Sequence, residues 1–227
     1  AYGSGFWLTA SSLGLPDAGI ATYSQMVERM ALLVKTSGAA VIADADTGYG
    51  GLLNVRHTVQ GYEAAGVTAI QIEDQVFPKK CGHTPNRACV PTSEMVARIQ
   101  VAVEARSDPN LIARTDAADA EGFDAARRRL DAYAAAGADV LFFEAARSEE
   151  ELARAVAGAP APMMANMATG GVTPILPVAT LREIGFAGAI FPALLSLAAA
   201  GAMTMALSRL RADGVGDGGG APLHDFG

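Results

Sequence analysis

The chain has 227 residues, of which 51% are hydrophobic and 18% are charged. This composition supports a sizeable buried core and excludes an intrinsically disordered chain. With 17 Lys and Arg against 24 Asp and Glu, the net charge is −7, which argues against a protein that binds duplex DNA through a basic surface. The length allows one large α/β domain or two small ones.

The chain has two cysteines, Cys81 and Cys89, too few for a disulfide framework. We therefore expect a reducing, cytoplasmic location. The uncharged stretch 186–207 is long enough to cross a bilayer, but Gly188 and Pro192 interrupt it. A buried strand followed by an apolar helix is the better interpretation.

Short β-rich runs alternate with helical patterns along the chain. The runs predict strands at residues 1–4, 40–43, 69–72, 111–113, 140–143, 163–165 and 189–191. The helical patterns begin near Thr22 and then cover 55–65, 92–105, 122–136, 148–157, 178–184 and 194–210. The glycine-rich segment 212–227 is predicted to be an extended tail.

Continuous apolar strands separated by helices predict a parallel sheet covered on both faces. A doubly wound sheet and a (β/α)8 barrel both fit, and no dinucleotide-binding glycine motif follows the first strand. We favour a single barrel domain over residues 1–227, because most strands end in polar residues and a barrel gathers its strand ends at one mouth. An eighth strand is missing from this pattern, and its simplest place is before Ala1.

The second predicted strand leads into Asp44 and Asp46, and the third leads into Glu73. Side chains two residues apart at a strand end point the same way, and clustered carboxylates repel unless a cation or a proton intervenes. A few hard oxygen ligands with room for water suit Mg²⁺, with Mn²⁺ as an alternative. Helix capping or bonding to loop amides is the structural alternative.

Two lysines precede Cys81 and a histidine follows it, in a connection that is long for a βα loop. Loops of this length often act as lids. The cationic neighbours predict a lowered pKa for the Cys81 thiol and a role in proton transfer. The spacing leaves an unreactive loop thiol equally open, and Cys89 is expected to be structural.

Arg114 closes a predicted buried strand, and its planar guanidinium suits a carboxylate ligand. A salt bridge to Glu144 is the alternative, and both interactions can hold together. The arginine run 127–129 is expected to be a solvated helix face.

Six motifs in register between Tyr2 and about Leu207 resemble the isocitrate lyase/phosphoenolpyruvate mutase superfamily. They are GSGF…SSLGLPDAGI, DADTGYGG, EDQVFPKKCGH, ARTDA, GADVLFFEA and NMATGGVTP. The resemblance implies a (β/α)8 barrel that binds Mg²⁺ and an α-oxycarboxylate. It also implies a homo-oligomer, a dimer or tetramer with a swapped terminal helix, whose partner is a small 2-hydroxy or 2-oxo diacid rather than nucleic acid or a membrane.

The resemblance further implies residue roles. The metal ligands, direct or through water, would be Asp44, Asp46 and Glu73. The catalytic residues would be Cys81, as general acid, Arg114 and Glu144. The substrate would be bordered by Tyr2, Ser4, Gly5, Phe6, Asp17, Gly82, His83 and Asn166.

The Cys-Gly-His phrase favours the lyase branch, because phosphonopyruvate-forming mutases usually carry an asparagine-containing loop there. The chain departs from methylisocitrate lyases at Phe6, at Thr169-Gly170 and at Leu197, where those enzymes carry glycine, Glu-Phe and arginine. Burying the extra charge of a tricarboxylate without that cation is costly. A dicarboxylate of the 2,3-dimethylmalate or oxaloacetate kind is therefore expected.

The predicted reaction is a retro-aldol-type cleavage of the C2–C3 bond of a 2-hydroxy dicarboxylate, with Glu144 and Tyr2 as candidate bases. Three alternatives stay open. The same site would serve oxaloacetate acetylhydrolase or phosphonomutase chemistry, or the barrel has lost catalysis and acts as a binding subunit.

Overall fold

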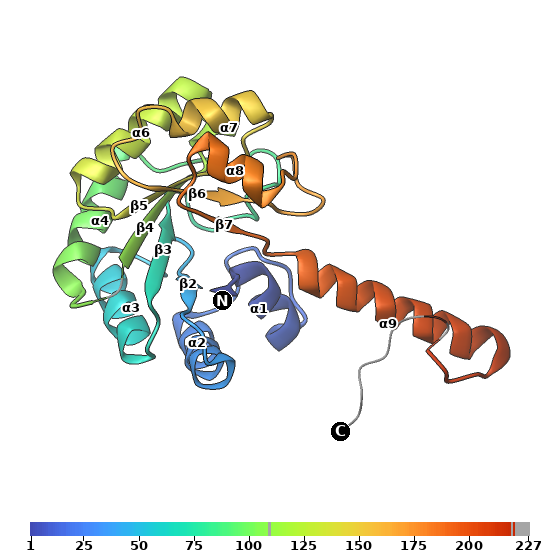
Figure 1. The fold of residues 1–227 in the computed structure, drawn as a ribbon. Helices are drawn as coiled ribbons and strands as arrows, with labels where there is room; N and C mark the ends of the chain where they lie inside the picture. The colour runs from blue at the N-terminus through green and yellow to red at the C-terminus, as the bar shows by residue number, and fades with distance from the viewer. Residues whose placement is uncertain (109, 219, 221–227) are drawn as a thin grey trace.

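The computed structural model describes residues 1–108, 110–218 and 220 (Figure 1). Within this part of the chain, seven parallel strands form one sheet in which each strand pairs with the next along the sequence. The strands are β1 (Tyr2–Gly3), β2 (Ile42–Asp44), β3 (Ala69–Glu73), β4 (Asn110–Thr115), β5 (Val140–Phe143), β6 (Met163–Asn166) and β7 (Gly188–Ile190). They curve into a nearly closed barrel, so the predicted TIM-type fold is confirmed.

Helices surround the strands (Figure 1). They are α1 (Gly5–Leu13), α2 (Tyr23–Ser37), α3 (Leu52–Ala64), α4 (Thr92–Ala105), α5 (Ala117–Glu121), α6 (Phe123–Ala135), α7 (Glu149–Val156) and α8 (Val178–Ile184), and a further helix, α9 (Leu194–Asp213), follows β7. Their starts follow local chemistry. Thr22 and Gln25 form a capping box at α2, and the Ser148 side chain accepts from the Glu151 amide at α7.

Two layers of apolar side chains make the core. The inner layer takes Ala69, Ile112, Phe142, Met164 and Ile190, one from each strand from β3 to β7. The outer layer packs the alternate positions, such as Ile70 and Leu111, against the helices. Because side chains alternate along a strand, the residue two places after an inner-layer position again points into the barrel.

Two helices were not predicted from the sequence, and several boundaries differ. Helix α5 has five residues, too short to show a helical period, and α1 lies between the predicted first strand and the helix that begins near Thr22, where no element was predicted. At the other end, α9 continues to Asp213 and stops at Gly214, which adopts a left-handed φ of 70°. The predicted tail therefore begins later than residue 212, and its residues 219 and 221–227 lie outside the described part.

Helix α9 extends away from the barrel (Figure 1) and has no buried residue. Its apolar side chains are strongly exposed, with Leu195 at 80% and Leu207 at 66%. Among the described residues, no helix combines the length and the apolarity that crossing a membrane requires.

Candidate active site

A cavity of about 250 Å³ lies at the mouth formed by the carboxyl ends of the strands. Most of the predicted site residues line it: Tyr2, Ser4, Phe6, Asp17, Asp44, Cys81, Gly82, His83, Arg114, Glu144 and Asn166. The three others contact residues of this set. Gly5 and Asp46 each donate a backbone amide to Asp44, and Glu73 pairs with Arg114.

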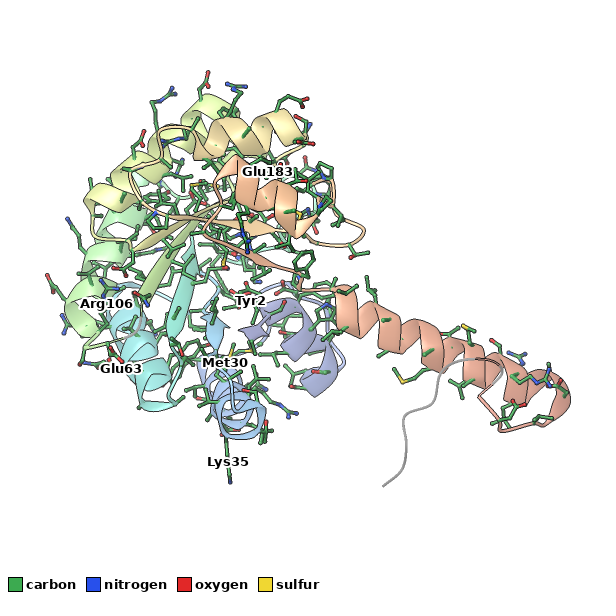
Figure 2. The ribbon with its side chains drawn as sticks, in the orientation of Figure 1. Tyr2, Met30, Lys35, Glu63, Arg106 and Glu183 are labelled. Atoms are coloured by element: carbon green, nitrogen blue, oxygen red, sulfur yellow. The ribbon has the colours of Figure 1, made fainter. Side chains whose placement is uncertain are left out.

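Strand alternation explains why these residues meet. Arg114 lies two residues after Ile112 in β4, and Asn166 lies two residues after Met164 in β6. Glu144 stands in the same relation to Phe142. Each polar side chain therefore forms the next layer above the inner apolar layer. Figure 2 shows Tyr2 among the strands, whereas Lys35 at the end of α2 points away from the molecule.

Arg114 is the centre of the site. Its Nη1 lies 3.3 Å from Glu73 Oε2 and 3.3 Å from Glu144 Oε2. Its Nε and Nη2 donate to the two oxygens of Asp116 at 2.9 and 2.8 Å. Burial alone would lower the pKa of Arg114, but the three carboxylates raise it well above its ordinary value. The guanidinium is therefore charged, and the predicted salt bridge to Glu144 is present.

The two aspartates of the DADTGYGG motif are held differently. Asp44 accepts hydrogen bonds from the backbone amides of Gly5 and Asp46 at 3.0 and 3.1 Å. Asp46 instead pairs with Lys79, whose Nζ lies 2.6 Å from Asp46 Oδ1 and 2.5 Å from Asp17 Oδ1. Burial raises the pKa of Asp46 to about 7, although Lys79 opposes this shift.

Lys79 belongs to a lid, which we define as residues 76–88. The lid is closed at its base by the Gln75–Cys89 bridge and by a hydrogen bond from the Val76 amide to the Ala88 carbonyl. Its middle lies on the cavity. A Cβ atom added to Gly82 would be 2.3 Å from Arg114 Nη2 and 2.8 Å from Glu144 Cγ. Only glycine allows the lid to approach this closely.

The expected effect of the two lysines on Cys81 is wrong. Lys79 turns to Asp17 and Asp46, and Lys80 donates to the Asn86 carbonyl. Burial raises the pKa of the Cys81 thiol, although the His83 backbone amide and Arg114 oppose the shift. The thiol is therefore protonated at neutral pH, as a proton donor must be.

His83 fixes the lid to the far side of the cavity. Its Nδ1 accepts the Val172 amide at 3.2 Å, which leaves the proton of the neutral ring on Nε2, 3.4 Å from Glu144 Oε1. Burial lowers the pKa of His83, so the ring is neutral at pH 7. Asn166 donates its amide to both oxygens of Glu144 at 3.2 and 3.1 Å. Asn166 Oδ1 is buried and has no hydrogen-bond partner among the described residues.

Part of the cavity lining is apolar, and we call it the apolar end. It consists of Phe6, Trp7, Ile190, Pro192 and Leu197, and the two aromatic rings pack edge to face with centroids 5.1 Å apart. The cationic side chains that line the cavity, Lys79 and Arg114, pair with Asp46 and Glu73, two of the predicted metal ligands. We call the part of the site formed by Asp44, Asp46, Glu73 and these two cations the acidic end.

Three buried residues of this site were not predicted from the sequence. Lys79 was treated only as a neighbour of Cys81, although it neutralises Asp46. Asp116 follows Arg114 by two residues and makes its two short hydrogen bonds. Gln71, two residues before Glu73 on the same strand face, accepts from the Tyr2 hydroxyl at 3.0 Å. Strand alternation could have placed Gln71 on the same face as Glu73. The partner of Lys79, in contrast, is visible only in the folded structure.

Comparison with known proteins adds a family match. The phosphoenolpyruvate phosphomutase family model matches residues 2–211. The chain is 47% identical over 193 residues to 2,3-dimethylmalate lyase of Eubacterium barkeri, covering 84% of this chain and 67% of that protein. It is 44% identical over 191 residues to 2-methylisocitrate lyase of Aeropyrum pernix, covering 84% of this chain and 62% of that protein.

The fold also resembles those of solved structures. Oxaloacetate acetylhydrolase in complex with 3,3-difluorooxalacetate matches with a TM-score of 0.92 and 38% identity, over 95% of this chain and 75% of that one. Phosphonopyruvate hydrolase in complex with oxalate and Mg²⁺ matches with a TM-score of 0.85 and 32% identity, over 99% of this chain and 79% of that one.

Proposed function

The chain belongs to the phosphoenolpyruvate mutase/isocitrate lyase superfamily, and from that premise we propose that it cleaves the C2–C3 bond of a 2-hydroxy dicarboxylate. The predicted family is confirmed, and the relatives named above include lyases, as the sequence predicted. One observation carries the proposal. A buried guanidinium, Arg114, lies between acids at one cavity whose lid carries a protonated thiol, Cys81.

Arg114 would bind the carboxylate at the 2-hydroxy end of the substrate. Its charge is fixed, and Asp116 holds the plane of the guanidinium by two hydrogen bonds. Asn166 Oδ1, a buried acceptor without a partner among the described residues, supports a hydroxyl on the neighbouring carbon. Its own amide group is occupied by Glu144, which fixes the orientation of Asn166.

The acidic end fits Mg²⁺. Glu73 Oε1 is buried and makes no hydrogen bond to any described residue. Across the described part of the chain, no three acidic, histidine or cysteine side chains converge as a direct metal cage. Mg²⁺ often keeps several waters and takes one or two carboxylates directly. Asp44, Asp46 and Glu73 would therefore hold it partly through water, and its chemistry when bound is Lewis-acid stabilisation of an oxyanion.

The proton transfers fall to two side chains. In the proposed reaction a base takes the hydroxyl proton, the C2–C3 bond breaks, and its electron pair passes to C3, which Cys81 protonates. Burial raises the pKa of Tyr2 well above its ordinary value, so Tyr2 is a poor base. Glu144 is the better candidate, since it lines the cavity and is held by Asn166.

The apolar end supports a dicarboxylate with alkyl substituents. A third carboxylate there would lie among Phe6, Trp7 and Leu197, and the two cations of the lining, Lys79 and Arg114, are already paired with acids. Burying that charge without a partner is unfavourable by several kcal/mol or more. The substrate class is therefore the alkyl-substituted malates, of which 2,3-dimethylmalate is the first to test.

Oxaloacetate hydrolysis is the second candidate, because the structure matches oxaloacetate acetylhydrolase closely. Incubation with Mg²⁺ and each compound, followed by ¹H NMR, separates the two. Pyruvate and propionate signals from 2,3-dimethylmalate support the lyase, whereas an acetate signal from oxaloacetate, with the accompanying oxalate detected by ¹³C NMR, supports the hydrolase. A new carbon–phosphorus product from phosphoenolpyruvate in a ³¹P spectrum would support a mutase.

Matched variants test the assigned acid. Cys81→Ser should lower turnover about 10²-fold or more, the usual contribution of a general acid, while Cys89→Ser keeps the parental rate. EDTA should abolish turnover, and added Mg²⁺ should restore it. Absence of every product from the parent chain with Mg²⁺ would refute the proposed enzyme and favour a binding subunit.

We also propose a cytoplasmic homo-oligomer. The unburied apolar side chains of α9 support a further copy of the chain as their cover, and the two free thiols suit a reducing compartment. Sedimentation velocity tests the assembly: a monomer at micromolar concentration would contradict it.

A further inference from the structure

We propose that Asp116 is a positioning residue shared by Arg114 and by Arg87 of the lid, so that lid closure and the orientation of Arg114 are coupled. The effects expected on kcat and KM rest on the proposed function, whereas the coupling between the lid and Arg114 does not. Neither Asp116 nor Arg87 belongs to the predicted site residues.

Asp116 holds Arg114 from the side. It directly follows β4 and is fully buried. Its two oxygens accept Nε and Nη2 of Arg114 at 2.9 and 2.8 Å, a bidentate arrangement that fixes the plane of the guanidinium as well as its position. Nη1 is thereby directed toward Glu73 and Glu144. Without Asp116 the plane of Arg114 has no comparable restraint.

Arg87 brings the lid to the same carboxylate. Its side chain is 3% exposed, and its Nε lies 3.3 Å from Asp116 Oδ1. Its Nη1 donates to the Thr84 carbonyl at 2.8 Å, which joins the contact to the lid backbone. The Nε–H group is not aligned on a hydrogen-bond acceptor among the described residues. The contact with Asp116 is therefore chiefly one of charge, and it can be released without breaking a well-formed hydrogen bond.

The backbone of Asp116 is anchored by a second buried network. The Asp116 amide donates to Asp74 Oδ1 at 2.9 Å. Asp74 Oδ2 in turn accepts the hydroxyls of Thr115 and Tyr133, both at 2.7 Å, and lies 3.4 Å from Arg129 Nη1. Arg129, expected on a solvated face, is buried for this reason. This network makes Asp116 a rigid point to which both arginines attach.

The charges explain the coupling. With the lid closed, one carboxylate lies between two guanidiniums that would otherwise repel each other. Removing the charge of Asp116 loosens Arg114 and also favours an open lid. Removing the charge of Arg87 opens the lid but leaves the two hydrogen bonds of Arg114 intact. The two substitutions should therefore both open the lid, but only the substitution of Asp116 should also displace Arg114.

Thiol labelling measures lid opening without any substrate. In a Cys89→Ser background, Cys81 on the lid reports through its rate of reaction with the neutral reagent 4,4′-dithiodipyridine. Arg87→Leu and Asp116→Asn should raise this rate about 5-fold or more, the lower end of typical coupling between two sites. Arg128→Leu, which removes an exposed arginine from α6, is the control and should react at the parental rate.

Steady-state kinetics separates the two residues. Asp116→Asn should lower kcat about 10²-fold, because a misplaced substrate-binding group costs roughly that much. Arg87→Leu should mainly raise KM, and Arg87→Lys should recover part of the loss. If Asp116→Asn does not fold, as judged by circular dichroism, Asp116→Glu takes its place, with the carboxylate retained but displaced.

The inference is overturned if Arg87→Leu labels Cys81 at the parental rate, or if the Asp116 variant that folds keeps the parental kcat. A parent chain without lyase or hydrolase activity refutes the proposed function instead, and the labelling result then decides the coupling alone.

Discussion

Substitution of Gly82 by alanine tests the closed lid most directly. The backbone of Gly82 does not have a left-handed φ, so space is what alanine lacks there. Its Cβ would lie 2.3 Å from Arg114 Nη2, whereas ordinary contact begins at 3.4 Å. Arg114 cannot move aside easily, because Asp116 holds two of its nitrogens. The lid must therefore lift by roughly the missing 1 Å.

The size of the effect follows from the strain. Overpacking of this kind costs about 1–3 kcal/mol, and a shift of that size in the closing equilibrium corresponds to a factor of roughly 5–150. We expect kcat/KM for the identified substrate to fall within that range in Gly82→Ala. The melting temperature should stay near that of the parent, because opening of the lid relieves the clash without disturbing the barrel.

Gly188→Ala is the matched control, because no atom lies within 4 Å of the added Cβ. It should keep the parental kcat/KM. Unchanged kcat/KM in Gly82→Ala, with melting temperatures equal to the parent, would refute the claim that the lid closes on Arg114 during turnover.

Three further predictions follow from the charges. Because burial raises the pKa of Cys81, its alkylation in the Cys89→Ser background should reach half its maximal rate above the ordinary thiol pKa of about 8.5; a midpoint below 8 would contradict this cause. Asp139 has a lowered pKa despite its partial burial, because Arg106 and the Leu111 amide donate to it. Asp139→Asn should therefore lose about 0.5–1 kcal/mol of unfolding free energy at neutral pH. This difference should vanish as the pH falls through the lowered pKa, below the ordinary value of about 3.9, and a difference that persists in acid would exclude the ionised carboxylate as its source. Finally, Glu73→Gln should lower the affinity for Mg²⁺ in the presence of oxalate, measured by titration calorimetry. An unchanged affinity would remove Glu73 from the metal site.

Much of the fold and the set of site residues could be predicted from the sequence. Strand periodicity is a local property, and in a parallel barrel it forces Arg114, Glu144 and Asn166 into one layer once the strands pair in order. The helix starts at Thr22 and Ser148 are equally local, since the capping side chain lies three residues from the amide that it binds. The mouth of the barrel was predicted from the polar residues that end most strands, and the roles of the site residues from the family resemblance.

The partner of each buried charged side chain was decided only by the tertiary structure. Lys79 precedes Cys81 by two residues, yet it pairs with Asp17 and Asp46 instead of lowering the pKa of that thiol. Arg129 reaches Asp74 across 55 residues of sequence. Burial and pairing depend on segments that meet only when the sheet closes, and the free energy of a charge depends on both. Position along the chain is therefore sufficient to bring a residue to the mouth, but its protonation and its role are set by the neighbours that folding supplies.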